Sequence, residues 1–364
     1  MRQQTGLTLV ELMISMVLGL VLTAGVMTLF VQSQQSYAAT REIAIMDQNA
    51  QILMDLVEAD LQRVGYAFGC RPDKAANMVN ITQVNESGGV ALPSIVDDTK
   101  LEGFSKTATN AVDSAALIGI SLDTYNSIKI GSDYFILLVG DPEKQGRVQT
   151  RTTGSGGGAN FKAMFEQEMP NLRGQVIYMA TPDCDQVSQF TQVNDTPVGA
   201  REITNITHSQ GAGTGTLVKN CENQIVGDYP SCDNPGTLGS EDFPAGGTIM
   251  VVEFLGYALN NNDQLIRINA LATDGSHASA LLDGVTEFKL EYGLATSSSP
   301  MQNGVRSVNV YATAQEINAD ASLEWADLVS LRLDFTLQSD LVVNGQPFEK
   351  RYSRLMTLRN EVIN

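Results

Sequence analysis

The sequence of 364 residues is poor in the side chains and motifs that most enzymes and metalloproteins use. It contains only two histidines, which leaves little for a histidine-based metal site. It has no Walker sequence, no hydrolase nucleophile elbow and no zincin helix, so we expect a protein that is not an enzyme and holds no cofactor or metal. Basic residues are also few: 23 Lys and Arg stand against 41 Asp and Glu, a formal net charge of -18. Because this charge repels phosphate backbones, we expect no nucleic-acid binding.

Charge is missing altogether from one stretch near the N-terminus. Residues 12–31 read LMISMVLGLVLTAGVMTLFV, and a helix of that length spans about 30 Å, the thickness of a bilayer's hydrocarbon core. Arg2 precedes the run and indicates a cytoplasmic N-terminus, with the bulk of the chain outside. The residues after Val31 form poor signal-peptidase sites, which favours a retained anchor over a cleaved signal peptide. We therefore predict a single-pass membrane protein.

A lone carboxylate, Glu11, directly precedes this apolar run. A charged side chain in the middle of a bilayer costs about 2.5–3.5 kcal/mol, and less near the interface, so an acid in this place needs a partner or a purpose. A side chain that merely reaches the lipid headgroups is the alternative interpretation.

Gly6 followed by LTLVELMISMVLGL resembles the cleavage region of type IV pilins and of type II secretion pseudopilins. The resemblance implies that a prepilin peptidase removes residues 1–6, and that Leu7 becomes the N-methylated first residue. It also implies that Glu11 neutralises the amine of Leu7 on a neighbouring subunit. The helix has no proline in the stretch where many major pilins carry one, so we expect a minor pilin and not the bulk filament subunit.

Beyond Val31 the pattern becomes amphipathic, with no glycine or proline before Gly65. We predict one helix over 7–65, of which 12–31 lies in the membrane. We expect the stripe in its second half to pack on the chain's own globular part, with a partner helix as the alternative. The apolar residues of this stripe recur every three or four positions: Met46, Ala50, Leu53, Val57, Leu61 and Val64.

Strand patterns dominate the C-terminal region. Every second residue of Val329–Leu337 is apolar, which is the period of a strand with one buried face. Asn260–Asp263 and Asn344-Gly345 predict hairpins. We expect residues 66–245 to form a loop-rich variable part and residues 246–364 an antiparallel sheet of meander type. Together with the helix this predicts an α+β, pilin-like fold in which the long helix packs on an antiparallel sheet. Two buried strands are predicted in the middle of the chain, at Tyr134–Val139 and Gln175–Met179.

Three C-terminal segments, and one after the helix, resemble the PilW family of minor pilins: Leu282–Gly293, Trp325–Leu333, Met356–Asn360 and Gly65–Cys70. The resemblance implies a minor pilin that primes assembly of type IV pili at or near the tip and supports adhesion and twitching motility. It implies as partners the other minor pilins, the major pilin, the inner-membrane assembly platform, prepilin peptidase and a tip adhesin. It also implies a location in the inner membrane, with the C-terminal part in the periplasm, and then in the pilus on the cell surface.

Two alternatives stay open. One is a J-like pseudopilin of type II secretion, which shares the long helix and the sheet. The other is a membrane-anchored periplasmic module whose residues 71–245 bind a ligand or a surface.

The four cysteines, Cys70, Cys184, Cys221 and Cys232, all follow the membrane segment. An even number in an oxidising periplasm predicts two disulfides, with three connectivities open. We expect Cys221–Cys232, which closes a short loop, and Cys70–Cys184 as the remaining pair.

Zinc binding is not indicated, because no C-x-x-C occurs and the two histidines are not at ligand spacing. We expect His208 and His277 to be loop residues, and Trp325 to be a core or sheet-edge aromatic.

Overall fold

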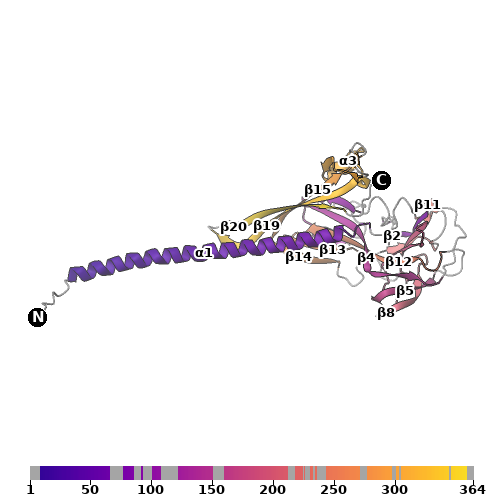
Figure 1. Cartoon of the computed structure of the whole chain (residues 1–364), viewed down its shortest axis with the longest axis horizontal. Coiled ribbons are helices and arrows are strands. Elements are labelled where there is room, and N and C mark those ends of the chain that lie inside the picture. Colours follow the sequence, from indigo (N-terminus) through magenta and orange to yellow (C-terminus); the bar gives the residue numbers. More distant parts are fainter. Residues whose placement is uncertain are drawn as a thin grey trace.

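A computed structural model of the chain shows one long helix projecting from a head made mostly of β-strands (Figure 1). The α+β, pilin-like fold predicted from the sequence is confirmed. The helix α1 (Leu9–Leu61) is followed by a turn to Gly65, whose φ of +68° takes the chain out of the helical direction. The structure describes residues 9–65, 77–85, 92, 101–107, 122–150, 160–211, 218–223, 225, 230–232, 234–235, 243–270, 277–296, 301–302, 305–343 and 346–358.

The described strands of the head fall into two main sheets and two small ones. The large sheet contains β1 (Asn77–Asn80), β3 (Leu101–Ser105), β4 (Asp133–Val148), β5 (Asn160–Met169), β6 (Val176–Ala180), β7 (Gln186–Thr191), β8 (Ala200–Thr207), β10 (Pro230–Ser231), β11 (Asn234–Pro235), β12 (Thr248–Leu259), β13 (Gln264–Asn269) and β14 (Ala278–Asp283). The second sheet has the order β18 (Val310–Ala312), β15 (Val285–Leu294), β19 (Leu328–Val343), β20 (Gln346–Thr357). The small sheets are β2 (Thr82–Val84) with β9 (Val218–Asn220), and β16 (Met301–Gln302) with β17 (Val305–Arg306). The short helices are α2 (Leu122–Ser127), α3 (Ala314–Ala319) and η2 (Trp325–Asp327).

The expected single meander over the C-terminal region is wrong. Strand β12 pairs with β4 and β6 from the middle of the chain, and β13 and β14 continue from it in the same large sheet. Strands β15, β18, β19 and β20 form the separate second sheet. The physical reason lies in β12: its residues TIMVVEFLGYAL are buried on both faces along most of the strand, as suits the centre of a covered sheet.

The individual strands and hairpins predicted from the sequence are confirmed. Tyr134–Val139 is the fully buried first part of β4, and β6 covers most of the second predicted strand. Strands β12 and β13 are antiparallel neighbours across the Asn260–Asp263 turn, where Asp263 has a φ of +57°. In β19 buried and partly exposed residues alternate, and the strand pairs antiparallel with β20. Asn344 and Gly345, between β19 and β20, lie outside the described residues.

The second half of α1 packs on the head along the predicted stripe, and packing against the chain's own head is confirmed. All six predicted residues are buried, from 0% exposure at Val57 to 5% at Met46. They share one core with side chains from both main sheets, among them Phe135 of β4 and Phe288 of β15. Fully burying an apolar side chain of this size contributes about 1.5–3 kcal/mol, so the stripe is a strong attachment. Figure 1 shows the hairpin of β19 and β20 running alongside this half of the helix.

Candidate functional site: the N-terminal helix and its junction with the head

The first half of α1 projects away from the head with its apolar side chains uncovered (Figure 1). Between Leu12 and Val31 the large apolar side chains are 46–71% exposed. Exposing so much contiguous apolar surface to water is unfavourable, and a patch of this size marks a surface that meets lipid or another protein. By length and composition the helix is able to cross a membrane, and none of its most apolar window is buried in the head.

Polar side chains inside the apolar half are satisfied within the helix. The hydroxyl of Ser15 donates to the carbonyl oxygen of Glu11 at 2.7 Å, and that of Thr23 donates to the carbonyl oxygen of Gly19 at 2.7 Å. Such bonds allow a hydroxyl to sit in lipid at little cost. Glu11 lies in the first turn of the described helix. Gly6 and Leu7 lie outside the described residues, so cleavage, methylation and the role of Glu11 stay predictions.

Acidic residues on one side of the helix face basic residues of β20. The ammonium of Lys350 and the hydroxyl of Tyr352 both donate to Asp47 Oδ1, at 2.5 and 2.7 Å. The hydrogen bond from Lys350 has the largest effect on the pKa of the Asp47 carboxyl, which it lowers, and the bond from Tyr352 lowers it further. Arg354 donates to Asp55 Oδ1 at 2.6 Å and lies against Glu58 at 2.5 Å. Because these pairs are exposed, each adds little stability, but together they fix the rotation of the helix on the strand.

A buried polar cluster holds the C-terminal end of the helix. Asp60 is 5% exposed and accepts from the hydroxyl of Tyr257 at 2.5 Å and from Arg267 Nε at 3.0 Å. Burial, and then the charge of Asp60, raise the pKa of the Tyr257 phenol, so this hydroxyl stays a donor. Arg63 lies 3.5 Å from Asp60 and 3.7 Å from Glu253 of β12. The helix end is therefore tied to β12 and β13 by charge as well as by packing.

Sequence reasoning missed this cluster, although a signal was present. Asp60 comes three residues after Val57 and four before Val64, which places it on the apolar stripe itself. An acid on a face predicted to be buried requires a buried partner. The partner could not be named, because Arg267 lies more than 200 residues further on, in a strand whose pairing the sequence alone does not specify.

The disulfide between Cys221 and Cys232 is confirmed, with the two Cα atoms 5.6 Å apart. Cys184 is also disulfide-bonded. Cys70 lies outside the described residues, so its pairing with Cys184 stays a prediction. As expected, Trp325 is a partly buried aromatic at the edge of the core: its ring centroid lies 4.9 Å from that of Tyr292, and the two rings are nearly perpendicular.

His208 follows β8 directly, outside any strand, but unlike a typical loop histidine it is buried at 3% exposure. Its ring packs near Phe161 and Phe190, and its Nδ1 is 2.9 Å from the carbonyl oxygen of Asn223, close to the disulfide. Burial lowers the pKa of the imidazole from 6.5 to about 4. The histidine is therefore neutral in the folded protein at pH 5, where it is protonated in the unfolded chain.

This difference predicts a loss of stability in mild acid. As pH falls from 6.5 toward 4, only the unfolded state gains the proton, so lowering the pH from 7 to 5 should cost about 2 kcal/mol through His208. Urea unfolding at pH 7 and pH 5, compared between the wild type and His208→Gln, measures this share. Equal pH dependence in the wild type and His208→Gln would contradict the prediction.

Two segments of the chain match known protein families. Residues 1–27 match the prokaryotic N-terminal methylation motif, and residues 254–358 match the family described as type IV pilus-assembly protein W. No match was found among curated proteins or among solved structures. The first segment includes most of the exposed apolar half of α1, and the second includes β19 and β20, which pack along its other half.

Proposed function

We propose that this chain, which is a type IV pilin-like protein of the PilW family of type IV pilus assembly proteins, acts as a minor pilin that primes pilus assembly. In this proposal prepilin peptidase cleaves after Gly6 in the inner membrane and Leu7 is N-methylated. The subunit is then extracted into a pilus, at or near the tip, where it supports adhesion and twitching motility. As a member of a pilin family the chain is a structural protein and not a catalyst.

The observation that carries the proposal is the division of α1 into two halves with different surroundings. The first half is apolar and uncovered, and the second half is buried against the head. A continuous helix of this kind suits a subunit that must leave the membrane, because the apolar half exchanges lipid for the helices of other subunits while the head stays folded. The partners in this proposal are the other minor pilins, the major pilin, the assembly platform, prepilin peptidase and a tip adhesin.

Glu11 has a defined role in this exchange. When the apolar halves of several subunits pack together, its carboxylate and the methylated amine of a neighbouring Leu7 are both removed from water. Opposite charges attract more strongly in such surroundings, and each leaves an uncompensated charge if the other is absent. The pair therefore favours one axial position of the incoming subunit.

The deciding experiment is the mass of the mature N-terminal peptide, isolated from membranes and from sheared surface pili. We expect a peptide that begins with methylated Leu7 in both fractions. An N-terminus at Met1, or after residue 31, would contradict the proposal. A deletion strain, scored for surface pili and for exoprotein export, separates the pilus from a secretion pseudopilus: loss of pili with normal export is the expected result.

A further inference from the structure

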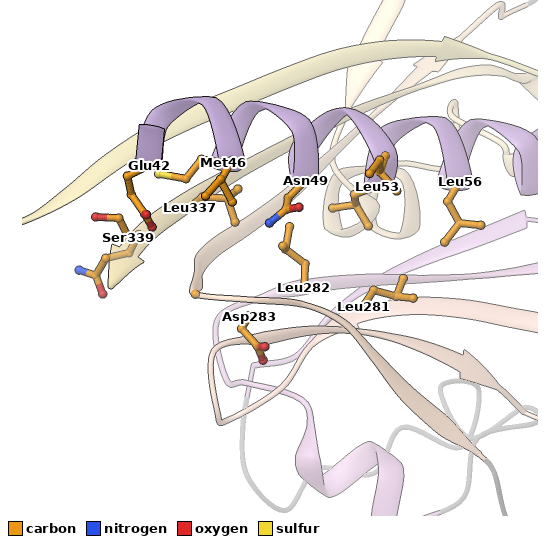
Figure 2. A pocket seen from close by; sticks show the side chains of 14 residues that line it. Glu42, Met46, Asn49, Leu53, Leu56, Leu281, Leu282, Asp283, Leu337 and Ser339 are labelled. Carbon is orange, nitrogen blue, oxygen red and sulfur yellow. The ribbon is translucent and has the colours of Figure 1, made fainter. Parts of the chain in front are cut away.

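A groove of about 420 Å³ runs along α1 on a side that the head leaves open. Figure 2 shows it between the helix, the end of β14 and the part of β19 around Leu337 and Ser339. The helix contributes Ile45, Ile52 and Leu56, which are 41%, 59% and 36% exposed. Leu281 and Leu282 of β14, both partly buried, line the opposite wall. The groove is thus a channel of mixed lining beside a helix, with leucines and isoleucines next to the polar residues Glu42, Asn49, Asp283, Gln338 and Ser339.

The exposed and half-buried helix residues of the groove follow a repeat that differs from the buried stripe, whose Met46 and Leu53 also line the groove. Glu42, Ile45, Asn49, Ile52 and Leu56 are spaced three and four residues apart in alternation, which is the a/d seam of a coiled coil. Isoleucines occupy the two d positions, while Glu42 and Asn49 occupy two of the three a positions. Polar residues in such a seam lower its stability but select the partner and the register. This pattern is typical of a helix that binds one particular second helix.

The position of the groove restricts the partner further. It begins eleven residues beyond Val31, about 16 Å past the end of the apolar run, and it follows the axis of α1. An occupant that runs alongside α1 at this distance from the membrane is the continuation of another membrane-anchored helix. The charge of the lining is complementary to a cation, since Glu42 and Asp283 are its ionisable residues among those described. A second copy of this chain does not fit, because a parallel pair in register would place Glu42 against Glu42.

We propose that this groove seats the extramembrane part of the N-terminal helix of a different pilin-like subunit, which places a lysine or arginine against Glu42 and Asp283. The inference rests on the proposed function, because it requires other pilin-like subunits in the same membrane. It adds a specific contact: a heteromeric helix pair whose register is set by polar residues outside the membrane.

Photocrosslinking in the intact membrane tests the groove. A photoreactive amino acid is placed in the full-length chain at Ile52, inside the groove, or at Gln51, the matched control. Gln51 is exposed and adjacent in sequence but lies about 100° around the helix. We expect crosslinks from Ile52, and not from Gln51, to a different protein that carries an N-terminal methylation motif. Equal crosslinking from both positions, or crosslinks from Ile52 only to lipid or to a second copy, would overturn the proposal.

Charge reversal tests the cation. Glu42→Lys should reduce the Ile52 crosslink at least about tenfold, since like charges replace opposite ones in the seam. Changing the facing lysine or arginine of the crosslinked subunit to glutamate should restore it. An unchanged crosslink in Glu42→Lys, or no restoration, would refute the register role. The mature N-terminus is measured in the same samples: methylated Leu7 without the crosslink rejects the groove alone, whereas an unprocessed N-terminus rejects the proposed function.

Discussion

Replacing Asp60 with alanine is expected to lower the free energy of unfolding of the head by about 3–5 kcal/mol, because it leaves Arg267 and the Tyr257 hydroxyl without their buried acceptor. The matched control is Asp47→Ala, which removes an acid of the same helix that also bonds to a cation and a tyrosine of the head. Asp47 is exposed, so this change should cost less than about 1 kcal/mol.

The measurement is urea unfolding of the full-length protein in detergent, followed by fluorescence. Trp325 is the only tryptophan of the chain and packs at the edge of the core that contains the helix stripe, so its emission reports on this junction. Combining Asp60→Ala with Arg267→Met should cost less than the sum of the single changes, since the double variant no longer leaves the charge of Arg267 uncompensated. Equal costs for Asp60→Ala and Asp47→Ala would show that burial does not decide the strength of these contacts.

Replacing Glu11 with glutamine is expected to leave membrane insertion and cleavage intact and to reduce the amount of this subunit in sheared pili at least about tenfold. Glutamine keeps the size and the hydrogen-bonding capacity of the side chain but removes the charge, so the amine of a neighbouring Leu7 loses its counter-charge in an apolar environment. Immunoblots of membrane and pilus fractions, normalised to the major pilin, give the ratio.

Ser15→Ala is the control for this experiment. Ser15 lies one helical turn further along the same side of α1, and its hydroxyl donates to the carbonyl oxygen of Glu11 in the same helix, at 2.7 Å. Its loss should leave incorporation within about twofold of wild type, because alanine suits a helix in lipid. Normal incorporation of Glu11→Gln would contradict the charge-pairing role and favour an acid that simply reaches the lipid headgroups.

Local patterns predicted those parts of the fold whose signals are local. The spacing from Met46 to Val64 identified the buried side of α1, and the alternation in Val329–Leu337 identified a half-buried strand. The arrangement of the strands could not be obtained in the same way. The residues of β12 are apolar on both faces, which indicates burial but does not say that β4 and β6, which lie far earlier in the chain, are its neighbours.

The same difference between local and long-range signals applies to the candidate site. The N-terminal run and Glu11 are recognised from a short continuous motif, and the Cys221–Cys232 pair from proximity in sequence. The groove was missed because only one of its walls, the helix, carries a readable repeat. Its other wall is formed by Leu281 and Leu282, which come close to Ile52 only through the pairing of β13 with β14.

The contacts between α1 and β20 also constrain how the protein is made. Lys350, Tyr352 and Arg354 are about 300 residues away in sequence from the carboxylates they bind. Under the proposed function the chain leaves the cytoplasm N-terminus first, so the buried stripe of α1 is exported long before β20, which packs along it. Contacts of such long sequence separation form late and slowly. The exported helix therefore stays open to chaperones and to wrong partners until synthesis is almost complete, and a premature stop that removes β20 yields an anchored protein without its closing strand.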